Sequence, residues 1–149
     1  MKKSIIIIAS IVVLFTFACT QKIDIEAEVK KEIEALYDVY AKSDLKWVDY
    51  YKKEYTVAAP DGSIQTKYSD SLRISMEDLY NRYDVILQDH GKPTVFADEN
   101  QALGFSTYDE LFINKATNDT FREMGTWIAL WKKQIDNSWK IEFETSHQK

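Results

Sequence analysis

The residues best suited to acid–base chemistry form a short acidic stretch inside an expected strand. Tyr108, Asp109 and Glu110 are consecutive. Because successive side chains of a strand point to opposite faces, Asp109 shares one face with Phe105 and Leu111, while Tyr108 and Glu110 take the other. A carboxyl group beside two apolar side chains would have a raised pKa and could act as a general base. The alternative for Asp109 is a structural ion pair with a lysine across the sheet.

Two histidines are the remaining candidates for proton transfer. His147 ends the last expected strand, where a side chain can lie near the mouth of a pocket, and we keep it as a candidate general base. His90 is expected in a solvated loop. Neither histidine has a second histidine or a carboxylate at metal-ligand spacing, and the sequence contains no glycine-rich phosphate loop. We therefore expect neither a metal nor a cofactor.

Five aromatic residues could line a pocket for a small apolar or aromatic ligand. Tyr37 and Tyr40 belong to an expected helix, Tyr80 to another, and Trp127 and Trp131 share one face of an expected strand. Aromatic side chains at such spacing also serve as ordinary core residues, and that alternative stays open.

The N-terminal residues have the pattern of a secretory signal peptide. Lys2 and Lys3 precede an apolar run from residue 5 to residue 18 that is 14 residues long, shorter than the roughly 20 that span a bilayer. The only cysteine, Cys19, follows directly. The segment 16–19, Thr-Phe-Ala-Cys, resembles a bacterial lipobox, which implies cleavage after Ala18 and acylation of Cys19. The alternative is an ordinary signal peptide, cleaved or uncleaved, with an unmodified cysteine.

This interpretation divides the chain into a signal peptide (1–18), a lipidated N-terminus and spacer (19–24) and one domain (25–149). Residues 19–149 carry 17 basic and 24 acidic side chains, a net charge of −7. Such a charge argues against binding nucleic acid and against electrostatic adhesion to anionic lipid. The lipid would therefore hold the domain in the cell envelope, outside the cytoplasm, at the periplasmic face or the cell surface, with the outer membrane favoured.

The hydrophobic pattern predicts an α+β domain. Apolar residues at helical spacing indicate a helix over 25–40, and Ser43-Asp44 breaks it and caps a short second helix. A brief strand, a turn at 60–63 and a return strand lead to a third helix over 69–83. Beyond His90 the pattern becomes strand-like in four runs: 94–97, 102–114, 121–135 and 139–145. These runs predict an antiparallel meander packed against the helices.

This order of elements resembles the NTF2-like superfamily, and the stretches 125–134 and 136–141 are similar to the closing hairpin of its SnoaL-like and DUF4440 group. The resemblance covers about 25–147. It implies a cone in which three N-terminal helices pack on a curved antiparallel sheet around a largely apolar pocket. The superfamily contains isomerases, dehydratases, cyclases and non-catalytic binding modules, and its sheets often pair, which implies a possible homodimer.

The resemblance does not extend to the catalytic residues of the ketosteroid isomerases in that superfamily. The position of their carboxylate base is occupied by Ala59, and the strand 126–130, where their oxyanion acid would lie, has no ionisable side chain. Their tyrosine would fall near Leu36, one residue from Tyr37. We therefore expect a non-catalytic module that binds a small apolar or aromatic ligand, or a partner segment. The alternative is a SnoaL-like lyase or isomerase with Asp109 or His147 as its base.

Overall fold

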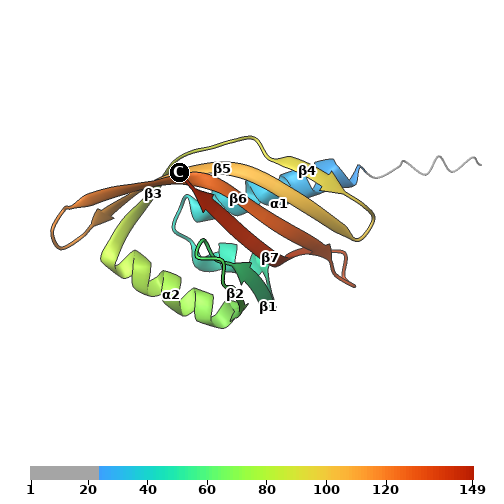
Figure 1. Ribbon diagram of the computed structural model, residues 1–149, viewed down its shortest axis with the longest axis horizontal. Coiled ribbons are helices and arrows are strands. Elements are labelled where there is room, and N and C mark those ends of the chain that lie inside the picture. The colour runs from blue at the N-terminus through green and yellow to red at the C-terminus, as the bar shows by residue number, and fades with distance from the viewer. Residues whose placement is uncertain (1–23) are drawn as a thin grey trace, which may run out of the picture.

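The computed structural model describes residues 24–149, so the proposed signal peptide and Cys19 lie outside the described residues. Two α-helices, one 3₁₀ helix and seven strands make up this part of the chain (Figure 1). In chain order they are α1 (Ile25–Tyr40), η1 (Leu45–Tyr50), β1 (Tyr51–Ala58), β2 (Ile64–Tyr68), α2 (Ser69–Arg82), β3 (Tyr83–His90), β4 (Thr94–Ala97), β5 (Gln101–Asn114), β6 (Thr120–Lys133) and β7 (Trp139–Gln148). Within residues 24–149, no helix is long and apolar enough to cross a membrane.

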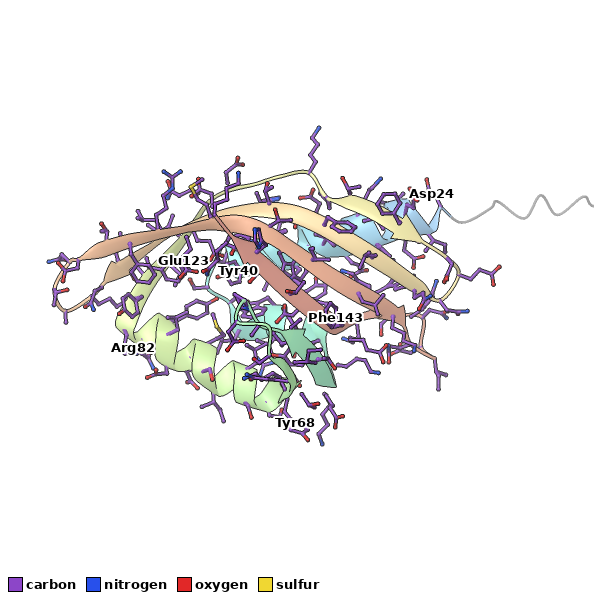
Figure 2. The ribbon with its side chains drawn as sticks, viewed as in Figure 1. Asp24, Tyr40, Tyr68, Arg82, Glu123 and Phe143 are labelled. Atoms are coloured by element: carbon purple, nitrogen blue, oxygen red, sulfur yellow. The ribbon has the colours of Figure 1, made fainter. Side chains whose placement is uncertain are left out.

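All seven strands belong to one curved, open sheet. Its order is β2-β1-β7-β6-β5-β3, with β4 pairing to β5 beside β3. Every pair is antiparallel except β1 with β7, which is parallel. The helices pack against this sheet, α1 on β4 and β5, and α2 on β1 and β3. Figure 2 labels Asp24, which directly precedes α1, and Arg82, the last residue of α2.

The expected α+β class and the curved sheet are confirmed, and the helical part differs in detail. The first helix spans 25–40 as predicted, because the Asp24 carboxylate accepts a hydrogen bond from the Ala27 amide at 3.0 Å and caps it. Asp44 caps the next element in the same way through the Lys46 amide. That element is a single 3₁₀ segment of six residues, so the three expected helices are two α-helices and one short 3₁₀ helix.

Strand β3 was not expected from the sequence. Its buried Val85 is followed by the polar pair Gln88-Asp89, which interrupts the hydrophobic alternation that identifies a strand. Pairing with β5, from Tyr83 opposite Asn114 to His90 opposite Tyr108, provides hydrogen-bond partners along one side of this segment's backbone. His90, which we expected in a loop, therefore ends a strand.

The core lies between α1 and the middle of the sheet. Val29 and Ile33 of α1 are fully buried, as are Trp131 of β6 and Ile141 of β7. The close approach of helix and sheet depends on Gly104, since a Cβ atom there would lie 2.7 Å from Ile33 Cδ1. This packing fixes α1 over one part of the sheet.

Candidate functional site

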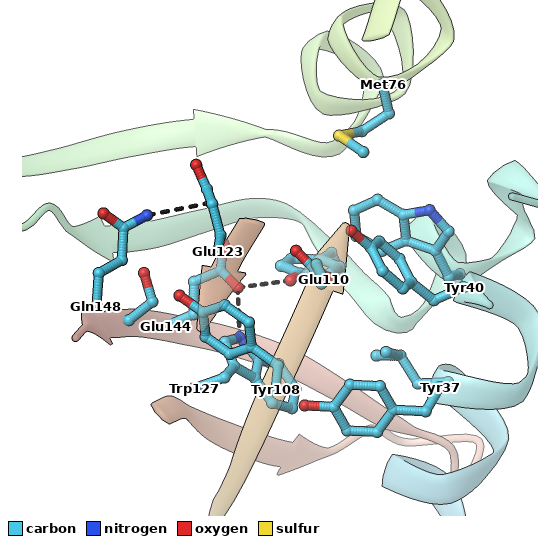
Figure 3. Close-up of a pocket in the computed structure, with 13 residues that line it drawn as sticks. Tyr37, Tyr40, Met76, Tyr108, Glu110, Glu123, Trp127, Glu144 and Gln148 are labelled. Atoms are coloured by element: carbon cyan, nitrogen blue, oxygen red, sulfur yellow. Dashed lines mark hydrogen bonds between the residues drawn. The ribbon is translucent and has the colours of Figure 1, made fainter. Parts of the chain in front are cut away.

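A cavity of about 260 Å³ lies between the sheet and the helices, lined by residues of α1, η1, β1, α2, β5, β6 and β7 (Figure 3). The central strands present alternate residues to it because side chains two apart in a strand share a face. Tyr108 and Glu110 come from β5, and Glu123 lies opposite Glu110 on β6. Tyr108 occupies space left by its partner Gly125, where a Cβ atom would lie 2.7 Å from the Tyr108 hydroxyl.

Six of the thirteen residues that line the cavity are aromatic, and several of their rings meet edge to face. The ring centroids of Tyr40 and Trp47 are 5.3 Å apart with planes at 77°, and those of Trp47 and Tyr51 are 5.8 Å apart at 73°. On the other side, Tyr37 meets Trp127 at 6.1 Å and 76°. Such pairs are favourable beyond the area that they bury, so the wall is defined before any ligand arrives.

Hydrogen bonds behind the wall hold two of these rings in place. The Tyr37 hydroxyl lies 2.7 Å from Oγ of the buried Ser106, and the Trp47 indole N–H donates to the Tyr80 hydroxyl at 3.1 Å. Burial raises the pKa of Tyr37 to about 12, a rise that the bond with Ser106 partly opposes. Tyr37 is therefore a neutral phenol at physiological pH.

Glu144 of β7 is the most firmly held carboxylate of the cavity. Its Oε2 accepts hydrogen bonds from the Tyr51 hydroxyl at 2.5 Å and from the Trp127 indole N–H at 2.9 Å. Burial raises the pKa of Glu144, and the two hydrogen bonds act in the opposite direction. Both donors are neutral, and Glu144 forms no salt bridge within residues 24–149.

Glu110 is the second carboxylate that faces the cavity. Burial raises its pKa, a hydrogen bond with Tyr40 lowers it, and the negative charges of Glu123 and Asp109 raise it further. Glu123 itself accepts a hydrogen bond from the Gln148 side chain at 3.2 Å (Figure 3). Three carboxyl groups from three adjacent strands therefore face one aromatic cavity.

The five aromatic candidates divide between cavity and core. Tyr37, Tyr40 and Trp127 line the cavity. Tyr80 stands behind the wall, where it accepts the hydrogen bond from Trp47. Trp131 is fully buried in the core cluster with α1. Trp127 and Trp131 share one face of β6, as the sequence predicted. Their different positions along the strand place Trp127 at the cavity and Trp131 in the core.

Asp109 and His147 do not line the cavity. Asp109 forms a two-bond ion pair with Arg122, one bond of which joins Arg122 Nε to Oδ1 at 2.7 Å, and hydrogen bonding to Arg122 lowers the pKa of Asp109. The ion-pair alternative therefore holds, with an arginine as partner. His147 is exposed, between Ser146 and Gln148, which both line the cavity. Alternation turns both candidate bases to the opposite face of the sheet.

His90 packs behind the cavity wall. Its ring stacks on Tyr37 with centroids 4.5 Å apart, and its Nε2 lies 3.8 Å from a carboxylate oxygen of Glu34. Within residues 24–149, no three His, Cys, Asp or Glu side chains are grouped closely enough to hold a metal ion.

Sequence reasoning missed Glu123 and Glu144, together with Trp47 and Tyr51. Alternation separates Glu110 from Asp109, but it does not identify the face that meets the helices, and Asp109 was the candidate base because it shares a face with Phe105 and Leu111. Glu144 carries no local signal, since its importance depends on which residues of β6 and β1 lie beside it. Its pairing opposite Ala129 brings it beside Trp127, and the sequence does not state this register.

The sequence matches no known family model and no curated protein. Its fold, however, is shared by solved structures. An NTF2-like superfamily protein from Salmonella enterica aligns with a TM-score of 0.65 at 15% identity, over 82% of this chain and 92% of the other. A ketosteroid isomerase-like protein from Erwinia carotovora aligns with a TM-score of 0.64 at 13% identity, over 84% and 96%.

A third structure supports the same assignment. An NTF2-like protein of unknown function in nutrient uptake from Rhodospirillum rubrum aligns with a TM-score of 0.65 at 14% identity, over 81% of this chain and 98% of the other. Identities this low establish a common fold and do not transfer an activity. The described part of this chain therefore has the NTF2-like fold, an open curved sheet wrapped around helices with an aromatic cavity between them.

Proposed function

We propose that this domain binds a small, largely apolar or aromatic ligand in its cavity. The observation that carries the proposal is a defined cavity of about 260 Å³ whose wall is aromatic and held by hydrogen bonds from behind. Small-molecule pockets are usually about 300–1,000 Å³ and mainly apolar, with a few polar groups that orient the ligand. The volume here therefore suits a ligand of about one aromatic ring with a short substituent.

A second candidate function is acid–base catalysis on a small organic substrate. It is favoured by one observation, that Glu110 and Glu144 face the cavity with raised pKa values. Carboxyl groups with raised pKa values in a cleft are frequent in active sites, although structural groups show them too. Glu110 is a better candidate base than Glu144. The Glu144 carboxylate already accepts two hydrogen bonds, which hold it in place and oppose its protonation. This candidate replaces Asp109 and His147 with residues that line the cavity.

We also propose that the chain is anchored in the cell envelope through acylated Cys19, as the lipobox resemblance implies. The domain itself is acidic, so attraction to anionic lipid would not hold it there. More than one acyl chain gives stable anchoring, since each buried methylene contributes about 0.8 kcal/mol.

A homodimer through the outer face of the sheet is our proposal for its assembly. That face carries Phe96, Leu103 and Phe105 beside Ile128 and Leu130, joined by the β4–β5 and β5–β6 pairing. Phe96 is 63% exposed. Two ion pairs flank this patch, Arg122 with Asp109 and Lys132 with Glu142, and limit the charge repulsion between two copies. A second copy could therefore meet the same patch across a two-fold axis.

Filling the cavity tests ligand binding. Ser146→Phe places a ring in the space that the ligand would occupy, so we expect the affinity for benzyl alcohol, a neutral aromatic probe, to fall by about tenfold or more. His147→Phe, the next residue on the opposite face, is the matched control and should bind as the unaltered protein does. Calorimetric titration of both variants, with their melting temperatures, checks this. Equal affinities in the two folded variants would refute the proposed site.

A proton-abstraction probe tests the catalytic candidate. Nitrobenzisoxazole loses a carbon-bound proton to a base as its N–O bond breaks, which releases a coloured cyanonitrophenolate. If Glu110 is a base, Glu110→Gln should abolish the rate above background, and Asp109→Asn should retain it. The base acts when ionised, so the rate should rise with pH through a value above the usual glutamate pKa of about 4.3. A rate lost in Asp109→Asn and kept in Glu110→Gln would contradict the assignment.

The anchor is tested by Cys19→Ser in a bacterial host grown with an alkyne-labelled fatty acid. We expect the unaltered chain to take up the label and to partition into detergent, because its acyl chains are apolar. The variant should do neither. Label incorporated equally by Cys19→Ser would exclude Cys19 as the acylated residue.

The dimer is tested by light scattering during size exclusion. Phe96→Asp buries a charge at the proposed interface and should give the mass of one chain where the unaltered protein gives two. Ile74→Asp is the control, because Ile74 is 69% exposed on α2, away from the sheet face. A monomer for the unaltered protein at high concentration would refute the dimer.

A further inference from the structure

The charges on the two faces of the sheet are arranged differently. On the outer face Asp109 pairs with Arg122, and Glu142 pairs with Lys52 at 3.1 Å and with Lys132 at 3.4 Å. Asp89, opposite Asp109, forms no salt bridge within residues 24–149. Hydrogen bonding to Arg122 lowers the pKa of Asp109. Partial burial alone would raise the pKa of Glu142, but its two lysines hold it below the usual range. Cations therefore compensate the carboxylates of Asp109 and Glu142 on the outer face.

The cavity carries the same type of side chain without such partners. Among the described residues that line it, three are glutamates and none is lysine or arginine. Glu144 is bonded by a phenol and an indole, and Glu123 by an amide. These donors are neutral and leave the carboxylate charge uncompensated. An ionised carboxylate in such a place is costly unless a cation approaches it.

The aromatic wall suits a cation as well as an apolar group. The faces of tryptophan and tyrosine rings carry negative potential and attract a cation within about 6 Å of the ring centroid. The ring planes of Tyr40 and Trp47 make an angle of 77°, and those of Trp47 and Tyr51 make an angle of 73°. The faces of these three rings therefore point in different directions. Trp127 lies on the other side of the cavity, with its N–H directed to Glu144. Rings in this arrangement can surround a compact ammonium group.

We propose that the cavity selects organic cations, with an ammonium group between the glutamates and the rings and an apolar or aromatic remainder against the wall. This inference rests on the proposed binding function and specifies the ligand's charge. The chemical class is a small protonated or quaternary amine. A carboxylic acid of the same size would meet three like-charged groups and is selected against.

Three probes of matched size test the charge selectivity: benzylammonium, benzyl alcohol and benzoate. We expect benzylammonium to bind more tightly than benzyl alcohol by about tenfold or more, and benzoate to bind most weakly. Calorimetric titration at neutral pH and low salt measures all three. Raising the salt concentration should weaken benzylammonium binding and leave benzyl alcohol unchanged, because only the charged probe is screened.

Single substitutions locate the effect. Glu144→Gln and Glu123→Gln each remove one charge and keep a hydrogen-bond acceptor, so each should reduce the affinity for benzylammonium by a larger factor than that for benzyl alcohol. Glu142→Gln, on the outer face, is the matched control and should change neither. Two glutamates are tested because one variant could misfold, and melting temperatures identify that case.

The outcomes separate the two proposals. If benzyl alcohol binds and benzylammonium binds no more tightly, charge selectivity is refuted and ligand binding stands. Charge selectivity is also refuted if benzoate binds best, or if Glu142→Gln weakens benzylammonium as much as the cavity variants do. If none of the three probes binds, the proposed binding function fails as well.

Discussion

The antiparallel register of β5, β6 and β7 determines which side chains meet the helices. Glu110 lies opposite Glu123, Tyr108 opposite Gly125, and Ala129 opposite Glu144. A slip of one residue in any of these pairings would turn a whole set of side chains to the other face. The chemical character of the cavity is therefore a consequence of strand register.

The same face of the sheet serves two purposes along its length. Toward one end, Trp131 and Ile141 pack against Ile33 of α1 and leave no space. Toward the other end of this face, Trp127 meets the edge of the Tyr37 ring and donates a hydrogen bond to Glu144 beside the cavity. Gly104 permits the close helix approach in the first region, and Gly125 gives Tyr108 its place in the second. The same face of the sheet therefore forms core at one end and cavity at the other.

The cavity is unfavourable for the stability of the fold. Burial of Glu110 and Glu144 disfavours their charged forms, and substitution of such groups by apolar side chains often stabilises a protein. The hydrogen bonds from Tyr51 and Trp127 offset only part of this cost, because neutral donors compensate a charge less well than a cation does. Groups that weaken a fold and still face a cavity are better explained by what they bind than by what they stabilise.

Local signals in the sequence determined much of the fold. Hydrophobic spacing and the Asp24 cap define α1, and Asn137, with φ of 67°, lies in the turn between β6 and β7. The alternation of side chains in a strand also predicts that Glu110 and Asp109 lie on opposite faces of the sheet. These features depend on residues that are close together in the chain, so they can be predicted from the sequence. Strand β3 lacks such a pattern, and its existence depends on pairing with β5.

The functional face was decided by tertiary structure. Alternation states that Asp109 and Glu110 point in opposite directions, but it does not state which direction leads to the helices. Packing of α1 on β5 makes that choice and leaves Asp109 with Arg122 outside. Glu144 gains its role from Tyr51, 93 positions away in the chain. Contacts over such separations arise from the register and curvature of the sheet, and no local pattern encodes them.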